Sequence, residues 1–184
     1  LADQHAIKPQ LAKLLGKIAG PAVPLSVRER FESSYRQNLT DQINHVTEFM
    51  EVRNRLEDGR IAVVPFKGFW LAERFYGNLA DREASDIDVF VNYSDLGKIM
   101  KLMPGTGYLI GEPFINQPDP GGCEFNYGKY IGGRCVSHLE FHWRMAPARF
   151  GLDISLDDLK GSIESSSIQG HELRVFNPSA SLLL

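Results

Sequence analysis

The chain has 184 residues, of which 43% are hydrophobic and 23% charged, and its net charge is -3. These values are typical of a globular protein with a real core, and they argue against a general polyanion binder, which would carry a basic excess. No segment has the length of a membrane span and residues 1–10 lack a signal-peptide core, so we expect a cytosolic protein with no membrane partner. Cys123 and Cys135 lack metal-type spacing and are expected as free thiols.

The N-terminal third predicts a helical arm. Apolar residues recur at spacings of three and four over 5–19 and again over 26–56, which is the pattern of two amphipathic helices. A segment rich in Gly and Pro at 20–24 separates the two helices. Ser26 can cap the second helix, and Gly59 follows its end.

From residue 60 the pattern changes to short strands that alternate with helices and turns. The first predicted elements are a buried strand over 61–66, a helix over 68–77, a strand over 85–91, a helix over 94–103 capped by Ser94 or Asp95, and a strand from 108. The later ones are an exposed loop over 111–121, strands over 123–130 and 134–145 joined at Gly132-Gly133, and a hairpin turning at Gln169-Gly170.

These elements predict an α+β fold in which a mixed sheet is flanked by helices. We expect two parts, a helical arm of residues 1–59 and an α/β domain of residues 60–184. The chain begins without Met and stops on an apolar run just after Pro178, where a helix starts. We therefore expect a fragment that is truncated at its C-terminal end.

A pair of aspartates occupies the predicted strand SDIDVFV. Ile87, Val89 and Val91 fall on one face at period two, so Asp86 and Asp88 share the opposite face, about 7 Å apart by the strand rise. Like charges repel each other, and strand interiors are poor in aspartate. Such a pair is typical either of a solvent-exposed strand face or of a cation site.

A third carboxylate lies in a later predicted strand, in the run SHLEFHW. His138, Glu140 and His142 share one face, and the apolar residues between them form the other. Three carboxylates from two adjacent strands can hold Mg²⁺ or Mn²⁺, which prefer oxygen ligands and usually bridge to phosphate. The same run leaves a second hypothesis open, a zinc site formed by His138, Glu140 and His142.

Basic residues and a glycine precede the aspartate strand. Gly68, at a strand-to-helix junction, can let an anion approach the backbone and the first N–H groups of the helix. Lys67 would add positive charge there, and Arg74 and Arg82 could also meet a triphosphate. A plain strand-to-helix turn with solvated basic side chains remains the alternative for these residues.

In this order, the features resemble the polymerase β-like nucleotidyltransferase superfamily, and more closely its uncharacterised bacterial branch. The matching residues, over about 60–145, are Lys67-Gly68, Tyr76, Arg82, Asp86-Ile87-Asp88, Gly107-Tyr108 and Glu140 with His142-Trp143. The chain departs from the superfamily after Gly68, where Phe69 offers no hydroxyl to a phosphate. It also has a longer distance from Gly68 to Asp86 than compact members.

The resemblance implies a transferase that moves a nucleoside monophosphate from an NTP to an acceptor hydroxyl, with pyrophosphate leaving. Asp86 and Asp88 would hold two Mg²⁺ (or Mn²⁺) ions, and Glu140 would bind the acceptor-side metal and help to deprotonate the hydroxyl. Without metal, loss of either aspartate is expected to leave the fold as stable or slightly more stable, because the repulsion is relieved.

The resemblance also implies nucleotide-binding residues and leaves the acceptor open. Lys67, Gly68 and Arg82 would bind the nucleotide, and His138, His142 and Tyr76 would lie around the metal ligands. The acceptor can be a small molecule, a nucleic-acid end or a protein. The alternative function is a non-catalytic nucleotide-binding or antitoxin-like regulatory partner with the same fold, which would bind another protein through the helical arm.

Overall fold

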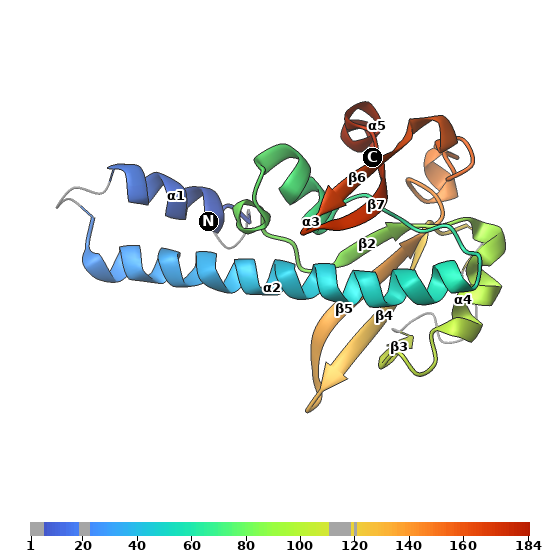
Figure 1. The fold of residues 1–184 in the computed structure, drawn as a ribbon, viewed down its shortest axis with the longest axis horizontal. Coiled ribbons are helices and arrows are strands. Elements are labelled where there is room, and N and C mark those ends of the chain that lie inside the picture. The colour runs from blue at the N-terminus through green and yellow to red at the C-terminus, as the bar shows by residue number, and fades with distance from the viewer. Residues whose placement is uncertain (1–5, 19–22, 111–118, 120) are drawn as a thin grey trace. The chain divides into compact units, whose positions relative to one another are not determined.

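The computed structural model describes residues 6–18, 23–110, 119 and 121–184 (Figure 1). Contacts divide the chain into two compact units, Leu1–Thr47 with Gly68–Ser85 and Glu48–Lys67 with Asp86–Leu184. The predicted boundary between an arm of 1–59 and a domain of 60–184 stays a prediction, because each unit takes residues from both sides of it. The predicted loop over 111–121 falls almost entirely outside the described residues.

Helices form the first unit. α1 (Lys8–Ile18) and the first part of α2 (Leu25–Asp58) follow the two predicted amphipathic patterns. α3 (Gly68–Leu71) continues as a π-helical turn over Ala72–Tyr76, and it ends at Gly77, whose φ of 69° favours glycine. Among the described residues, no helix is long and apolar enough to cross a membrane.

Buried polar side chains of α2 hold the segment that runs toward the aspartate strand. Asn38 donates hydrogen bonds to the carbonyl oxygens of Ala80 (2.9 Å) and Arg82 (3.0 Å). Gln42 donates to the carbonyl oxygen of Ala84 (2.9 Å). Asn38 and Gln42 are both buried, so they satisfy backbone groups that would otherwise lose their hydrogen bonds to water.

Asp81 joins α1 and α2 through a buried carboxylate. It accepts hydrogen bonds from Lys13 of α1 and from the Tyr35 hydroxyl of α2 (2.7 Å), and only 4% of its side chain is exposed. Gln10 of α1 donates to its backbone oxygen (2.9 Å). Burial, together with the bond to Asp81 and its charge, raises the pKa of Tyr35 to about 12, so the hydroxyl keeps its proton at neutral pH.

Asp81→Asn is expected to lower the free energy of unfolding by about 1–3 kcal/mol, because Lys13 and the Tyr35 hydroxyl lose a charged, buried partner. Urea unfolding measures the loss, and amide exchange should accelerate in α1. Asp41→Asn is the matched control, since Asp41 accepts an exposed hydrogen bond from Gln37 on α2. Equal losses in the two variants would contradict the role given to Asp81.

A five-stranded mixed sheet forms the centre of the second unit. Its strand order is β1 (Val64–Pro65), β2 (Ile87–Phe90), β5 (Arg134–His142), β4 (Glu124–Ile131) and β3 (Tyr108–Ile110). β2 and β5 are parallel, and the other neighbouring strands are antiparallel. The predicted α+β class, with a mixed sheet flanked by helices, is therefore confirmed.

Several predicted elements are shorter or differently capped. α2 begins at Leu25, so Ser26 lies inside the helix instead of capping it, and β5 ends at His142 and not at residue 145. The strand expected over 61–66 pairs only at Val64 and Pro65, at the edge of the sheet, because proline has no N–H to give to a ladder. The helix expected over 94–103 begins as a 3₁₀ turn (Tyr93–Asp95) before α4 (Leu96–Leu102). Asp95 makes no side-chain capping bond there and pairs with Lys98 instead.

Both predicted hairpin turns are confirmed. Gly132 and Gly133 join β4 to β5, and Gln169 and Gly170 join β6 (Ile163–Ile168) to β7 (His171–Phe176). All four turn residues have positive φ, as two-residue turns of type I′ require. The second hairpin forms its own two-stranded sheet. α5 (Pro178–Leu183) follows it at the predicted place.

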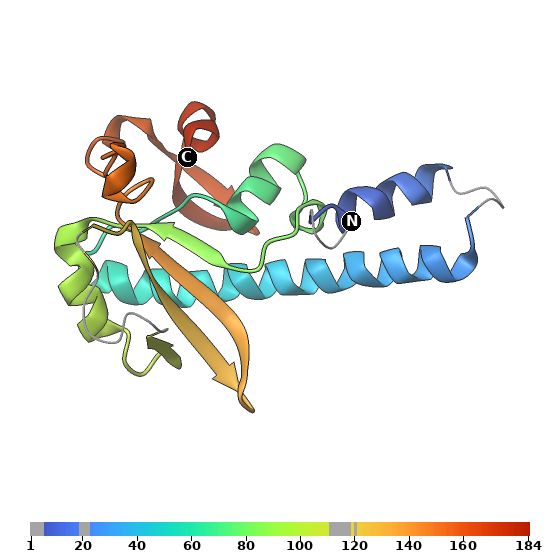
Figure 2. The same cartoon turned by 180° about the vertical axis from the view of Figure 1, so that it is seen from behind.

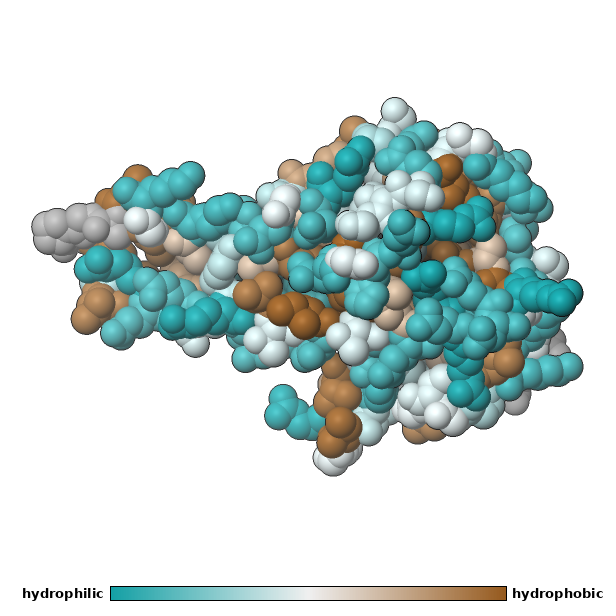
Figure 3. All heavy atoms as spheres, in the orientation of Figure 1, coloured by the Kyte–Doolittle hydropathy of each residue, from teal (hydrophilic) through white to brown (hydrophobic). Residues whose placement is uncertain are grey.

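The second unit packs its core on both faces of the sheet. Figures 1 and 2 show the last turns of α2 across one face, where Phe49, Val52 and Leu56 are buried. β7 lies beside β1. The cluster of this region comprises Val64, Phe66, Phe90, Leu156, Leu159, Phe176 and Ala180. Figure 3 shows a small apolar patch at the tip of the β4–β5 hairpin, where Ile131 and Val136 are exposed.

Candidate metal and nucleotide site

Parallel pairing of β2 and β5 brings the three predicted carboxylates together. Asp88 and Glu140 are register partners, and Asp86 precedes β2 by one residue. The potential ligand atoms form two overlapping groups, Asp86 with His138 and Glu140, and Asp88 with Glu140 and His142. Within each group these atoms lie within 4.8 Å of one another. Glu140 belongs to both groups and so links the two aspartates, although among the described residues no group contains both Asp86 and Asp88.

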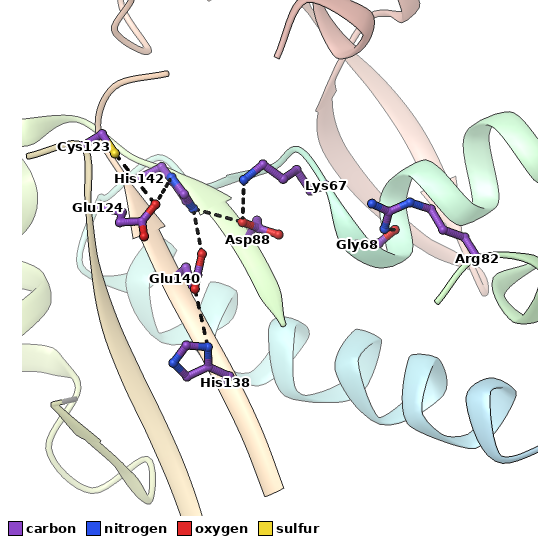
Figure 4. A network of polar contacts seen from close by, with 9 residues as sticks. All are labelled: Lys67, Gly68, Arg82, Asp88, Cys123, Glu124, His138, Glu140 and His142. Carbon is purple, nitrogen blue, oxygen red and sulfur yellow. Dashed lines mark hydrogen bonds and ion pairs between the residues drawn. The ribbon is translucent and has the colours of Figure 1, made fainter. Parts of the chain in front are cut away.

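Asp88 is buried between two cationic groups, not on a solvent-exposed strand face. Lys67 Nζ and His142 Nε2 each lie 3.0 Å from Asp88 Oδ1, and 4% of the Asp88 side chain is exposed (Figure 4). Burial alone would raise the pKa of Asp88. The hydrogen bond with His142 and the charge of Lys67 outweigh burial, so the pKa is lower than usual and Asp88 is a carboxylate at neutral pH.

His142 lies at the centre of the polar network. Its Nε2 also contacts Glu140 Oε2 (3.3 Å), and its Nδ1 contacts Glu124 Oε2 (3.2 Å). Burial lowers the pKa of His142, but hydrogen bonds with Asp88, Cys123 and Glu140 outweigh it and raise the pKa to about 10. Without a bound metal, His142 and Lys67 therefore supply the positive charge beside Asp88.

Asp86 is less compensated by positive charge than Asp88. Burial raises its pKa, and the charges of Asp88 and Glu140 raise it further, while Lys67 and His138 act weakly in the opposite direction. The ionised form of Asp86 therefore opposes folding near neutral pH. This is the electrostatic situation in which a cation is most favourable.

The two aspartates are therefore expected to differ in their effect on stability in the absence of metal. Asp86→Asn removes an unfavourable charge and should raise the free energy of unfolding, by at most about 1 kcal/mol because part of the group faces water. Asp88→Asn leaves Lys67 and His142 without their buried partner and should lower it by about 1–3 kcal/mol. The structure thus revises the sequence-based expectation for Asp88.

Thermal and urea unfolding in EDTA at pH 7 measures both variants against the wild type. Each is the other's control, since the two residues lie two positions apart and receive the same substitution. Equal shifts of the same sign would contradict the contrast between a compensated Asp88 and an uncompensated Asp86.

Gly68 and Arg82 lie in the first unit and contact each other. Gly68 is buried, has a φ of 54° that favours glycine, and accepts a hydrogen bond from Arg82 Nη1 on its carbonyl oxygen (3.2 Å, Figure 4). Tyr76, in the same unit, is exposed at the end of the π-helical turn. Nucleotide binding by Lys67, Gly68 and Arg82 stays a prediction.

The structure does not support the hypothesis of a zinc site formed by His138, Glu140 and His142. Among the described residues, no group of three close donors contains both histidines. The two side chains belong to separate groups because they are four residues apart on an extended strand. The expectation of free thiols is confirmed, since neither Cys123 nor Cys135 forms a disulfide.

β4 adds two residues that the sequence did not single out. Glu124 and Asn126 are register partners of His142 and Glu140, so they share the face of the carboxylates, and Cys123 precedes Glu124. The Asn126 Oδ1 atom is buried and has no hydrogen-bond partner within the described part of the chain. An unpaired buried oxygen next to a carboxylate cluster favours a ligand there.

Comparisons with known proteins agree with the fold and identify a family. The family model described as "Uncharacterised nucleotidyltransferase" matches residues 1–184. Among solved structures, the chain is similar to a "putative nucleotidyltransferase" from Thermotoga maritima, with 14% identity and a TM-score of 0.51 over 76% of this chain and 81% of that one. At this identity the likeness shows the fold alone. The search of curated proteins found no match.

Proposed function

Because this chain belongs to the family of uncharacterised nucleotidyltransferases, we propose that it transfers a nucleoside monophosphate from an NTP to an acceptor hydroxyl. The bond between the α-phosphorus and the bridging oxygen breaks, the acceptor oxygen bonds to that phosphorus, and pyrophosphate and the hydroxyl proton leave. The observation that supports this most is that the parallel pairing of β2 with β5 places Glu140 close both to Asp86 and to Asp88.

The donor set fits a hard divalent cation. Asp86, Asp88 and Glu140 offer carboxylate oxygens, which Mg²⁺ and Mn²⁺ prefer, and Asn126 adds a buried oxygen that has no partner among the residues that the structure describes. The raised pKa of Asp86 marks a negative charge that the protein does not neutralise. Bound by these oxygens, Mg²⁺ would supply charge neutralisation for the phosphates and acidify the acceptor hydroxyl.

The remaining side chains orient the carboxylates. Lys67 and His142 hold one oxygen of Asp88, Oδ1, and His142 also contacts Glu140, so both strands present their carboxylates in fixed positions. His138 Nδ1 lies 3.5 Å from the other side of Glu140, at Oε1. We assign nucleotide and metal binding to Asp86 and Asp88, and acceptor activation to Glu140.

Pyrophosphate release tests the proposal. The wild type is incubated with each of the four α-labelled NTPs, Mg²⁺ and a panel of acceptors comprising small alcohols and sugars, RNA ends and proteins. The expected result is Mg²⁺-dependent pyrophosphate release with the label on one class of acceptor. NTP binding without release on any acceptor would contradict transfer and favour the regulatory alternative.

A further inference from the structure

A second cluster of potential metal ligands lies on the other side of His142, and two of its three members, Cys123 and Glu124, have no role in the proposed transfer. It comprises Cys123, Glu124 and the Nδ1 atom of His142. The opposite ring nitrogen, Nε2, faces Asp88 and Glu140. The imidazole thus separates a set of carboxylates from a mixed set that contains sulfur, nitrogen and oxygen (Figure 4).

We infer that Cys123, Glu124 and His142 form a binding site for Zn²⁺. Tetrahedral zinc, with typical bond lengths to sulfur, nitrogen and oxygen, requires about 3.4 Å between the nitrogen and oxygen ligands and about 3.6 Å between sulfur and oxygen. The observed distances are 3.2 Å from His142 Nδ1 to Glu124 Oε2 and 3.8 Å from Cys123 Sγ to Glu124 Oε2. All three ligand atoms lie within 4.8 Å of one another.

The chemistry of the three donors selects this ion. A thiolate and an imidazole are ligands that Mg²⁺ binds poorly, whereas zinc accepts sulfur, nitrogen and carboxylate oxygen together. Three protein ligands leave a fourth tetrahedral position for water. Zinc at this site therefore does not compete with magnesium for the oxygen ligands of Asp86, Asp88 and Glu140.

The surroundings of the cluster match those of a metal-binding histidine. Such a histidine usually gives its other ring N–H to a carboxylate, which fixes the tautomer and the ring orientation. Here His142 Nε2 lies 3.0 Å from Asp88 Oδ1, and the ring is 4% exposed. With zinc on Nδ1, the remaining ring proton lies on Nε2 and points to Asp88.

The backbone holds the ligands in place before any ion binds. Trp143 N donates to Cys123 O (2.9 Å), and Glu124 is the register partner of His142, so the start of β4 is fixed to the end of β5. Glu124 keeps 35% of its side chain exposed, which gives an ion a path to the cluster. The site meets the requirements of ligand identity, spacing, supporting contacts and access.

Cobalt(II), which replaces zinc in such sites, is the probe. It is titrated into metal-free protein without Mg²⁺ or nucleotide, and a thiolate ligand gives a sulfur-to-cobalt charge-transfer band. We expect the band to saturate at one ion per chain, to persist in Cys135→Ser and to disappear in Cys123→Ser. Zinc affinity is then measured by competition with a chromophoric chelator. It should fall at least about tenfold in Cys123→Ser and stay at the wild-type value in Cys135→Ser.

Three results would overturn the site. They are no charge-transfer band in the wild type, loss of the band in Cys135→Ser with retention in Cys123→Ser, or zinc binding that Asp86→Asn removes and Cys123→Ser leaves intact. The last would place zinc at the carboxylates. Asp86→Asn should keep the band while losing Mg²⁺-dependent NTP binding, so failure of the zinc site and failure of the proposed transfer give different results.

Discussion

Asp86→Asn is expected to lower NTP turnover by at least about a hundredfold. Loss of a residue that orients a metal ligand can already lower activity by about a hundredfold, and loss of the proposed ligand itself should lower it no less. The same variant should unfold no more easily than the wild type, since the ionised Asp86 opposes folding. Loss of activity together with retained or increased stability is a combination that a folding defect does not produce.

Calorimetric titration with ATP, GTP, CTP and UTP, with and without Mg²⁺, measures the binding part of this prediction. We expect Mg²⁺ to strengthen NTP binding by the wild type and to have no effect on Asp86→Asn. Asp95→Asn is the control, because Asp95 is an aspartate of the same unit that pairs with Lys98 near the start of α4. Equal Mg²⁺ dependence in Asp86→Asn and wild type would remove Asp86 from the site.

Glu140→Gln is expected to lower kcat by about a hundredfold or more while KM for the NTP changes little. In the proposed mechanism a carboxylate on the acceptor side acts where the nucleophile forms, whereas the nucleotide would be held chiefly at Asp86 and Asp88. Glutamine keeps the shape of the side chain and the register of β5 with β2, so it removes the charge alone.

Steady-state pyrophosphate release measures kcat and KM separately for this variant. Glu172→Gln is the control, because Glu172 is an exposed glutamate on β7 of the same unit. If Glu140→Gln keeps the wild-type kcat, Glu140 has no role in catalysis and is only a polar residue on the face of β5. A higher KM with unchanged kcat would instead move Glu140 to nucleotide binding.

The sequence predicted the elements that carry Asp86, Asp88 and Glu140, because period-two patterns are local. It also predicted both two-residue turns, since Gly132-Gly133 and Gln169-Gly170 are local signals. The sequence did not predict how short β1 is. Its length depends on its position at the edge of the sheet, and that position is set by pairing with β2, which lies further along the chain. Burial of Asp88 likewise depends on Lys67 and His142, which come from two other places in the chain.

The part of β4 in the site could not be predicted because the hairpin contains an irregularity. Counting from the turn, Ile131 faces Arg134, and a regular ladder would place Glu124 opposite Phe141 on the apolar face. The register shifts by one between Lys129 and Tyr130, so Glu124 lies opposite His142 instead. A shift of one residue moves every side chain to the other face.

A crystal structure with Mn²⁺ and an α,β-methylene NTP tests the central claim most directly, since the anomalous signal of manganese locates the ion. We predict manganese at coordination distance, about 2.0–2.2 Å, from carboxylate oxygens of Asp86 and Asp88, with the triphosphate bound to the same ion. Nucleotide bound elsewhere, or manganese bound away from Asp86, Asp88 and Glu140, would contradict it.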